Sequence, residues 1–394
     1  MIKKITKVFG RLFVVFAVAL AAVIICSGVG VHADNGDTVR VSTAKELKSA
    51  IKNANVGTII FKTDAFLNVT IKADKKAKGK SLIIDAENSI ITNKAVFADI
   101  DIRSAKQYTE SVSGNNISLS DSYIPEGIIV SKKKKVKSFT VYSSQGIFWN
   151  NFTLRNGAKI SAYELIFSGD EIPVKSSYNK SKKQVTIKCS YDGCDRSYTI
   201  KLDKNGRITS LDCESNWPEA DYNESYTYDS NGNLLKSYGS ENTSGNYSTE
   251  VTYSGNQRMK SVYKSEYESG EYTFTYDKKG NLVHEEYIGV GSIDGESFDF
   301  ATVTDYEYDK NGRLTYERWE DSASGYFVET SYTYDSKGFQ TEQIINSSGS
   351  ESVYKFKFNK AGDMIEKTYS CEGYKETTTY EYDKLGNPIG EEYN

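Results

Sequence analysis

A nine-residue phrase recurs along the second half of this 394-residue chain, and it constrains the fold more than any other feature. Positions equivalent to its glycine follow one another every 23–26 residues, with one longer interval of 32. A fixed period of this size indicates a repeat architecture. The eight units read IKLDKNGRI from Ile200, YTYDSNGNL from Tyr226, VTYSGNQRM from Val251, FTYDKKGNL from Phe274, YEYDKNGRL from Tyr306, YTYDSKGFQ from Tyr332, FKFNKAGDM from Phe356 and YEYDKLGNP from Tyr380.

Each unit has the chemistry of a β-hairpin. Two aromatic residues separated by one position place both rings on one face of a strand. Aspartate then starts a turn by accepting a backbone hydrogen bond, and glycine three residues later supplies the left-handed conformation of a type I turn with a bulge. An apolar residue begins the return strand two positions after the glycine. The predicted turn residues are Asp203, Gly206, Asp229, Gly232, Asp277, Gly280, Asp309, Gly312, Asp335, Gly338, Gly362, Asp383 and Gly386, with Gln257 in the glycine position of the third unit.

One hairpin buries too little surface to be stable alone, whereas neighbouring hairpins can pair edge to edge into a meander.

The same turns also suggest calcium loops. An EF-hand loop, however, needs glycine at its sixth position and a bidentate acid at its twelfth, and these turns have neither. We therefore predict turns, no metal site and no cofactor.

The phrase resembles the YD repeat of the Rhs family, over about residues 189–394. That resemblance implies a secreted or cell-surface protein whose repeats form a spiralling β-sheet shell, which can enclose a toxin or serve as a binding surface. With about eight units and no effector region after them, we expect an open sheet or a partial spiral in this chain.

The first half opens with helix signals. Thr43 and Glu46 have the spacing of a capping box, in which each side chain bonds the other residue's backbone amide. Gly57 is a suitable stop after the helix. The predicted apolar face comprises Ala44, Leu47, Ile51 and Ala54.

Short β-branched runs follow, broken by Asn, Asp, Gly and Lys, and they favour a coiled solenoid over a sandwich. Ile60, Leu82 and Ile102 are spaced about one coil apart, so we expect them to stack in a common interior. From Val39 to Ile102 the chain resembles right-handed parallel β-helix proteins of the pectin-lyase kind. In pectin-degrading lyases the fold carries calcium-binding aspartates and a catalytic basic residue, and neither can be placed here. The predicted fold class is all-β: a short right-handed β-solenoid with an N-terminal capping helix, followed by a β-meander of hairpins.

The N-terminus has the layout of a secretory signal peptide. Lys3, Lys4, Lys7 and Arg11 precede an apolar run, and a small-residue cleavage site ends at Ala33; an uncleaved anchor is the alternative. We expect a secreted or cell-surface protein with domains at 1–33 (signal peptide), 34–174 (solenoid), 175–188 (transition) and 189–394 (repeats).

After cleavage, the chain has 45 Lys+Arg against 53 Asp+Glu, so we predict no nucleic-acid partner. No later stretch is apolar enough to span a bilayer. The oligomeric state cannot be predicted.

Export permits disulfides, and four cysteines remain after cleavage. Cys189 and Cys194 flank a plausible tight turn, so we predict one disulfide among Cys189, Cys194 and Cys213 without fixing its pairing. Cys371 has no predicted partner. A zinc site is disfavoured because the cysteine spacing does not fit and histidine is nearly absent.

The repeats concentrate aromatic residues, with 30 Tyr and 17 Phe in the chain. We expect the rings that define the repeat to build the core of the sheet, namely Tyr228, Tyr276, Tyr308, Tyr334 and Tyr382. Tyrosine also stacks on sugars and anchors protein contacts. Residues outside the repeat phrase are the predicted ligand-binding set: Trp319, Tyr326, Tyr263 and Tyr267.

His284 is the one histidine of the mature chain, so no histidine-based catalytic triad has support, and we predict no enzyme activity. The predicted function is recognition or adhesion, with extracellular glycan or a cell-surface protein as partner. The alternatives are a structural spacer that displays other components and, less favoured, a polysaccharide lyase or hydrolase that uses a carboxylate pair.

Overall fold

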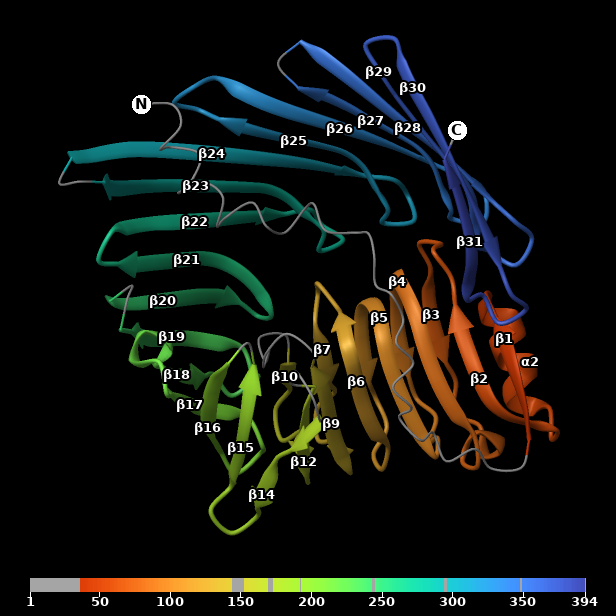
Figure 1. Ribbon diagram of the computed structural model, residues 1–394, viewed down its shortest axis with the longest axis horizontal. Coiled ribbons are helices and arrows are strands. Elements are labelled where there is room, and N and C mark those ends of the chain that lie inside the picture. The colour runs from red at the N-terminus through yellow and green to blue at the C-terminus, as the bar shows by residue number, and fades with distance from the viewer. Residues whose placement is uncertain are drawn as a thin grey trace. The chain divides into compact units, whose positions relative to one another are not determined.

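Two kinds of β-structure follow one another along the chain, a parallel solenoid and an antiparallel meander (Figure 1). The computed structural model describes residues 36–143, 152–168, 173–191, 193–242, 245–293, 296–347 and 349–393. The predicted signal peptide lies outside these residues. Nowhere in the described part of the chain is there a helix with the length and apolarity that a bilayer crossing demands.

The predicted capping box is present at the N-terminus of α2 (Ala44–Lys52). The Thr43 side chain accepts from the Glu46 amide at 3.2 Å, and Glu46 accepts from the Thr43 amide at 3.1 Å. Leu47 and Ile51 are buried as expected, but Ala44 and Ala54 are exposed and Ala50 completes the apolar face. The helix ends at the C-cap Asn53, and Gly57 lies inside the next strand, so its predicted role as a helix stop was wrong.

The solenoid has about five turns and three walls of parallel strands. The first wall consists of β1, β2, β4, β5, β6, β9 and β12 in that order, and β13 pairs antiparallel with β12 at its end. The second wall contains β3, the ends of β4 and β5, β7 and β10. The third wall is the pair of β8 and β11. The strands are β1 (Asp37–Val41), β2 (Val56–Lys62), β3 (Asn68–Ile71), β4 (Ser81–Asn93), β5 (Asp99–Glu110), β6 (Asn116–Tyr123), β7 (Ile128–Val130), β8 (Lys135–Val136), β9 (Ser138–Ser143), β10 (Phe152–Leu154), β11 (Lys159–Ile160), β12 (Tyr163–Ser168) and β13 (Pro173–Lys175), with a 3₁₀ turn η1 (Lys75–Ala77).

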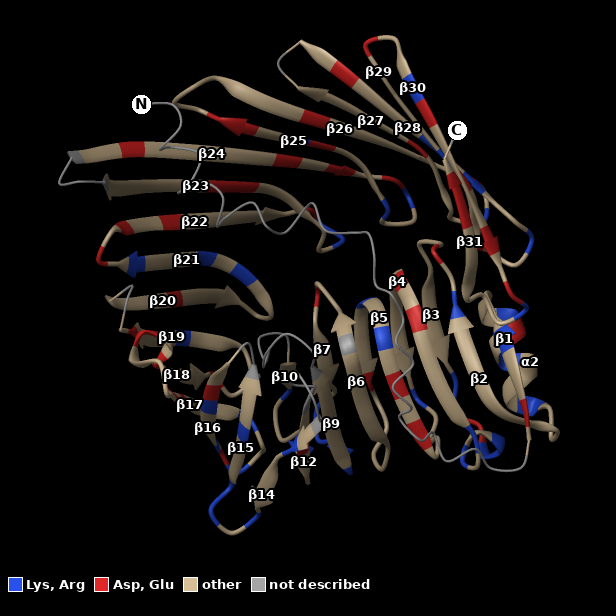
Figure 2. Cartoon of the chain, viewed as in Figure 1, with Lys and Arg blue, Asp and Glu red and all other residues tan. Residues whose placement is uncertain are grey.

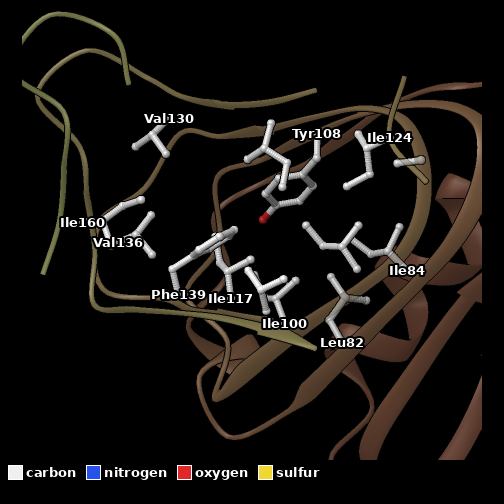
Figure 3. Close-up of a cluster of buried hydrophobic side chains, with 14 of the residues drawn as sticks. Leu82, Ile84, Ile100, Tyr108, Ile117, Ile124, Val130, Val136, Phe139 and Ile160 are labelled. Carbon is white, nitrogen blue, oxygen red and sulfur yellow. The ribbon is translucent and has the colours of Figure 1, made fainter. Parts of the chain in front are cut away.

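Stacked aliphatic side chains fill the solenoid interior (Figure 3). Neighbouring coils place Ile59 beside Leu82 and Ile84 beside Ile102. Leu82 and Ile102 are fully buried, as predicted, but they belong to adjacent ladders. Ile60 pairs with Ile83 and is only half-buried, because strand alternation turns it away from the interior that Ile59 enters. The predicted stack was therefore wrong at two positions, because Ile59 and Ile100, not Ile60 and Ile102, pair with Leu82.

A buried carboxylate fixes one corner of this interior. Glu110 is fully buried and accepts hydrogen bonds from the Tyr108 hydroxyl at 2.8 Å, Asn115 Nδ2 at 3.0 Å and the Val112 amide at 3.0 Å. Burial raises the pKa of Glu110, although the bonds from Asn115 and Tyr108 oppose the shift. A buried carboxylate with this many donors is satisfied and holds the turn after β5 in place.

The second sheet is a continuous antiparallel meander of 18 strands in sequence order. It begins at Ser177, so the expected transition segment contributes β14 and the start of β15. The strands are β14 (Ser177–Asn179), β15 (Gln184–Tyr191), β16 (Cys194–Leu202), β17 (Ile208–Ser215), β18 (Tyr222–Tyr228), β19 (Leu234–Glu241), β20 (Gly245–Ser254), β21 (Gln257–Ser265), β22 (Glu268–Tyr276), β23 (Leu282–Ile293), β24 (Glu296–Tyr308), β25 (Leu314–Asp321), β26 (Tyr326–Tyr334), β27 (Gln340–Ser347), β28 (Ser350–Phe358), β29 (Met364–Cys371), β30 (Tyr374–Tyr382) and β31 (Pro388–Tyr393), with a 3₁₀ turn η2 (Pro218–Ala220) after β17.

The first repeat turns contact the last coils of the solenoid. The Ile160 amide donates to the Asn205 carbonyl at 3.0 Å, and the Tyr163 hydroxyl donates to the Gly206 carbonyl. The next turn lies so close that a Cβ on Gly232 would come 2.0 Å from the Leu154 carbonyl oxygen. Only glycine allows this approach.

The last repeat turns contact the first strands of the solenoid. The Phe66 amide donates to the Gly338 carbonyl at 2.9 Å, and the Phe66 ring lies 4.8 Å from that of Tyr334. Arg40 of β1 forms a two-pronged ion pair with Asp363, with Nη1 to Oδ2 at 2.8 Å. Their side chains are only 7% and 3% exposed, so this pair lies in the interface itself.

We expect Arg40→Ala to lower the free energy of unfolding by about 3–5 kcal/mol, because it leaves the Asp363 carboxylate buried without its partner. Urea denaturation followed by tyrosine fluorescence measures the change. Arg103→Ala is the matched control, since Arg103 pairs with Asp101 but is half exposed, and it is expected to cost less than about 1 kcal/mol. Equal losses in the two variants would show that the Arg40–Asp363 pair does not stabilise the interface.

Candidate functional site

The aspartate of each repeat turn bonds to backbone amides, as the sequence predicts. Asp309 Oδ1 accepts from the amides of Asn311 at 2.8 Å and Arg313 at 3.0 Å, and the Gly312 amide donates to the Asp309 carbonyl at 3.1 Å. The same pattern recurs at Asp203, Asp229, Asp277, Asp335 and Asp383, and Asn359 takes the place of aspartate in the seventh turn. Every repeat hairpin also has a register shift at the end of its first strand. The predicted turns with a bulge are therefore confirmed.

The third unit departs from the alignment. Ser254 pairs directly with Gln257, so this hairpin closes with a two-residue turn, Gly255–Asn256. Gly255 has φ +62° and supplies the left-handed residue, whereas Gln257 already belongs to β21. Glycine followed by asparagine suits such a turn. The expected equivalence of Gln257 with the repeat glycines was wrong.

The register gives the meander two chemically different faces. Directly paired residues share a face, and Tyr263–Gly270–Gly289–Phe300 and Thr304–Trp319–Val328–Ser347 trace one face from β21 to β27. We call this side, which carries the repeat tyrosines, the aromatic face. The opposite side is the outer face. Tyr198, Ile200 and Leu211 of β16 and β17 are buried in one hydrophobic cluster with the solenoid. Beyond β18, the described strands contact mainly the strands before and after them, so this part of the meander is a single layer.

Cross-strand ion pairs join neighbouring strands on the outer face. Figure 2 shows both basic and acidic residues along the strands of the meander. Lys236 bonds Glu250 at 2.6 Å and Lys260 bonds Glu271 at 2.5 Å. His284 also lies on the outer face. It is exposed, and its Nδ1 is 2.7 Å from Asp305 Oδ1. Such pairs stabilise neighbouring strands.

Stacked rings cover the aromatic face. Tyr272 and Tyr287 stack with centroids 4.2 Å apart, and Tyr287 lies 5.3 Å from Phe300. Trp319 and Tyr326 meet edge to face at 6.1 Å. Ring pairs of this geometry add stability beyond the area they bury.

The predicted ligand-binding residues divide between this face and one edge of the sheet. Trp319 and Tyr263 lie on the aromatic face and are half-buried. Tyr326 and Tyr267 are 44% and 56% exposed, and they lie where one hairpin connects to the next. Figure 1 shows such a connection at the left ends of β21 and β22, whereas the repeat turn between β22 and β23 lies at the right ends.

Two residues that the sequence analysis did not select occupy equivalent places. Trp217 lies between β17 and β18 and is 43% exposed, and Tyr374 begins β30 and is 57% exposed. With Tyr267 and Tyr326 they put an exposed ring at every second connection between hairpins, and we call this row the connection edge. The sequence could have pointed to Trp217 and Tyr374 through their position near the middle of the interval between two repeat turns.

The repeat tyrosines are half-buried and tied into the sheet. The hydroxyls of Tyr334 and Tyr382 donate to the carbonyls of Leu314 and Met364 at 2.7 and 3.0 Å. Burial raises the pKa of Tyr228 and Tyr382 to about 12. These contacts agree with the expectation that the repeat rings build the sheet itself.

The four cysteines of the described residues, Cys189, Cys194, Cys213 and Cys371, are free thiols, which contradicts the expected disulfide. The register is the reason. Cys189 pairs with Arg196 and Cys194 pairs with Tyr191, so the two sulfurs do not face each other across the hairpin. Cys213 lies opposite Tyr198 one strand further on.

The hollows on the sheet are shallow. One, of about 450 Å³, is lined by Tyr238, Tyr247, Lys264 and Glu266, and another, of about 580 Å³, lies beside Cys189. Neither includes Trp319, Tyr326, Tyr263 or Tyr267. Both the aromatic face and the connection edge therefore suit a ligand that lies across a surface.

No protein-family model matches the chain, and a comparison with curated proteins gives no match. Among solved structures, a crystal structure of TcdB2-TccC3-TEV is similar over 56% of this chain and 15% of its own, with 11% identity and a TM-score of 0.25. A porin-like protein from Bacteroides uniformis is similar over 49% of this chain and 91% of its own, with 12% identity and a TM-score of 0.26. These scores are low, and the fold description rests on the strand order and register given above.

Each turn aspartate should stabilise its hairpin. Hydrogen bonds from Arg313 and Asn311 outweigh the opposing effect of burial and hold the pKa of Asp309 below its usual value. We expect Asp309→Ala to lower the free energy of unfolding by about 1–2 kcal/mol at pH 7. Because the folded-state pKa is depressed, this contribution is present above the ordinary aspartate pKa of about 3.9 and is lost as pH falls through the folded value.

Thermal unfolding at pH 7 and pH 3 measures the effect. Asp299→Ala removes an exposed carboxylate from the outer face of β24 and is the control, expected to change stability little at either pH. A loss at Asp309 that persists unchanged at the lowest pH would contradict the role given to its carboxylate.

Proposed function

We propose that this protein is an extracellular recognition protein that binds glycan through the aromatic face and connection edge of its repeats. The row of four exposed rings, Trp217, Tyr267, Tyr326 and Tyr374, carries the proposal. These rings recur at every second connection between hairpins, and a tyrosine ring combines an apolar face for stacking on a sugar with a polar tip.

The geometry favours an extended ligand. Tyr326 and Tyr374 are at connections four strands apart, which corresponds to roughly 19 Å across the sheet at the usual strand spacing. A linear polymer that runs across the strands can contact successive rings, and several weak contacts along one chain combine into useful affinity.

Two other functions compete with this one. A cell-surface protein could use the same rings as anchors, since exposed Tyr and Trp are common in the centres of protein interfaces. A spacer that only displays other components needs none of these rings. Polysaccharide lyase or hydrolase activity is a further alternative; burial and the neighbouring Asp85 raise the pKa of Asp64 to about 6, so carboxylates do lie near one another in the solenoid half.

The repeat half is, in our proposal, a YD-repeat sheet of the Rhs kind that works as an open binding surface. Its support is the recurrence of the turn aspartate, the left-handed glycine and the paired rings in successive hairpins. A location outside the cell is part of the same proposal, and the charged, apolar and small-residue order of residues 1–33 supports it.

Ring removal tests the binding proposal. A glycan array probed with residues 34–394 identifies the bound class, and Tyr326→Ala combined with Tyr374→Ala should then weaken binding at least about tenfold, at roughly 1–3 kcal/mol per stacked ring in comparable sites. Tyr238→Ala is the matched control, because Tyr238 is 42% exposed but faces the outer side opposite Ser225. Unchanged binding in the double variant, or an equal loss in the control, would reject these rings as the site.

Export is tested separately. Expression of the full chain in a Gram-positive host should give protein in the culture medium or on the cell surface, with a mature N-terminus at Asp34 by Edman sequencing. Retention inside the cell with Met1 intact would contradict the extracellular location.

A further inference from the structure

Glutamates on the aromatic face bond to tyrosine hydroxyls instead of to cations. Glu224 accepts from the Tyr247 hydroxyl at 2.7 Å, and Glu268 accepts from the Tyr287 hydroxyl at 2.5 Å. Further pairs of this kind are Tyr332 with Glu317 at 2.6 Å, Tyr374 with Glu376 at 2.7 Å and Tyr393 with Glu391 at 2.7 Å. Since a phenol is neutral, each pair satisfies the carboxylate and leaves its negative charge uncancelled.

The proton of each pair stays on the phenol. Burial and the adjacent carboxylates raise the pKa of the Tyr247, Tyr287 and Tyr332 phenols. These hydroxyls therefore remain protonated donors at any physiological pH.

Several acids of the outer face pair with lysine or arginine, whereas Glu286, Glu307 and Glu381 on that face form no ion pair in the described part of the chain. On the outer face, Lys355 and Lys357 bond Glu342 and Glu366 at 3.3 and 2.7 Å. Within the described residues, no ion pair involves the aromatic-face acids Glu224, Glu268, Glu285, Glu317, Glu376 or Glu391.

Some cations do reach the aromatic face, but they lie over rings. Arg258 covers Phe274 with its guanidinium carbon 4.0 Å from the ring centre, and Lys367 lies 5.3 Å from the centre of Tyr354. Arg207 and Arg313 are held at the turns by Asp203 and Asp309. The rings and carboxylates from β18 to β31 thus form a surface of negative charge and aromatic faces.

We infer that the ligand of the aromatic face is an amino-sugar polymer whose amines are free and protonated. This inference rests on the proposed glycan-binding function and names its substrate class. An ammonium group can donate to an unpaired glutamate while its sugar ring stacks on the neighbouring tyrosine, and a cation is also attracted to the face of that ring. A uronic-acid or sulfated polymer meets carboxylates and is repelled.

The spacing of the phenol-paired glutamates across the sheet also favours an extended cationic ligand. The phenol-paired glutamates occur on β18, β22, β25, β30 and β31, so one extended polycation that crosses the strands can contact several of them together. Binding of this kind gains strength with chain length and weakens with salt, because exposed charges are screened within about 8 Å at physiological ionic strength.

The decisive test compares three glycans of similar length with mature protein, residues 34–394. Fully deacetylated chito-oligosaccharide carries free amines, its N-acetylated form has the same backbone without charge, and oligogalacturonate carries carboxylates. We expect the deacetylated form to bind about tenfold or more tighter than the acetylated form, measured by isothermal titration calorimetry at pH 6, and oligogalacturonate not to bind.

Matched variants separate this site from general attraction of a polycation to an acidic protein. Glu268→Gln and Glu317→Gln keep an oxygen acceptor for the Tyr287 and Tyr332 hydroxyls and remove one charge each, so the fold is retained. Each substitution should weaken binding of the deacetylated oligomer about five- to tenfold and leave binding of the acetylated oligomer unchanged. Glu271→Gln makes the same charge change on the outer face and should have no effect.

The outcomes distinguish the two proposals. Equal affinity for the deacetylated and acetylated oligomers, preference for oligogalacturonate, or equal losses in all three variants would each overturn the amino-sugar inference and leave glycan binding standing. If the three oligomers fail to bind and a broad glycan array is blank as well, the proposed function falls together with the inference.

Discussion

The bonds from each turn aspartate to the amides ahead of it are the constraint on which the repeat sheet depends. A hairpin tip has amides that no neighbouring strand can satisfy, and the carboxylates of Asp277 and Asp309 each take two of them. Outside the third unit, the turn then has one geometry, with a bulge at the same place in each hairpin. Because a slip of one residue would exchange the two faces of a strand, this fixed turn is what keeps every tyrosine pair on the same side.

The same turns also join the two halves of the protein. Their tips are small and their backbone groups point outward, so the carbonyls of Asn205 and Gly338 can accept from solenoid amides at Ile160 and Phe66. Glycine has two effects at Gly232: it adopts a positive φ, and it lets Leu154 approach without a side chain between them. A repeat phrase that is sufficient for a hairpin therefore also provides the surface that packs on the solenoid.

Local signals were predictable from sequence, and relations between distant segments were not. The capping box at Thr43, the turns and the two-sheet organisation follow from a few neighbouring residues each. Ile60 was placed in the interior because spacing along the chain cannot decide which of two adjacent residues faces inward, whereas the parallel register does. The expected disulfide failed for a similar reason, since sequence spacing does not show that Cys189 faces Arg196. Tyr374 was missed because its exposure depends on the position of a connection rather than on the repeat phrase.

The register also determines what each face of the meander can do. Both faces carry glutamates, but those opposite lysine on a neighbouring strand are neutralised, as Glu250 is by Lys236, whereas those beside tyrosine keep their charge, as Glu268 does beside Tyr287. Ion pairs therefore cancel part of the charge of the outer face. The aromatic face satisfies its hydrogen bonds but not its charge, and burial further disfavours the ionised form of Glu285 within it. A single-layer sheet built in this way can be stable on its own and still gain electrostatic energy when a cationic ligand covers its aromatic side.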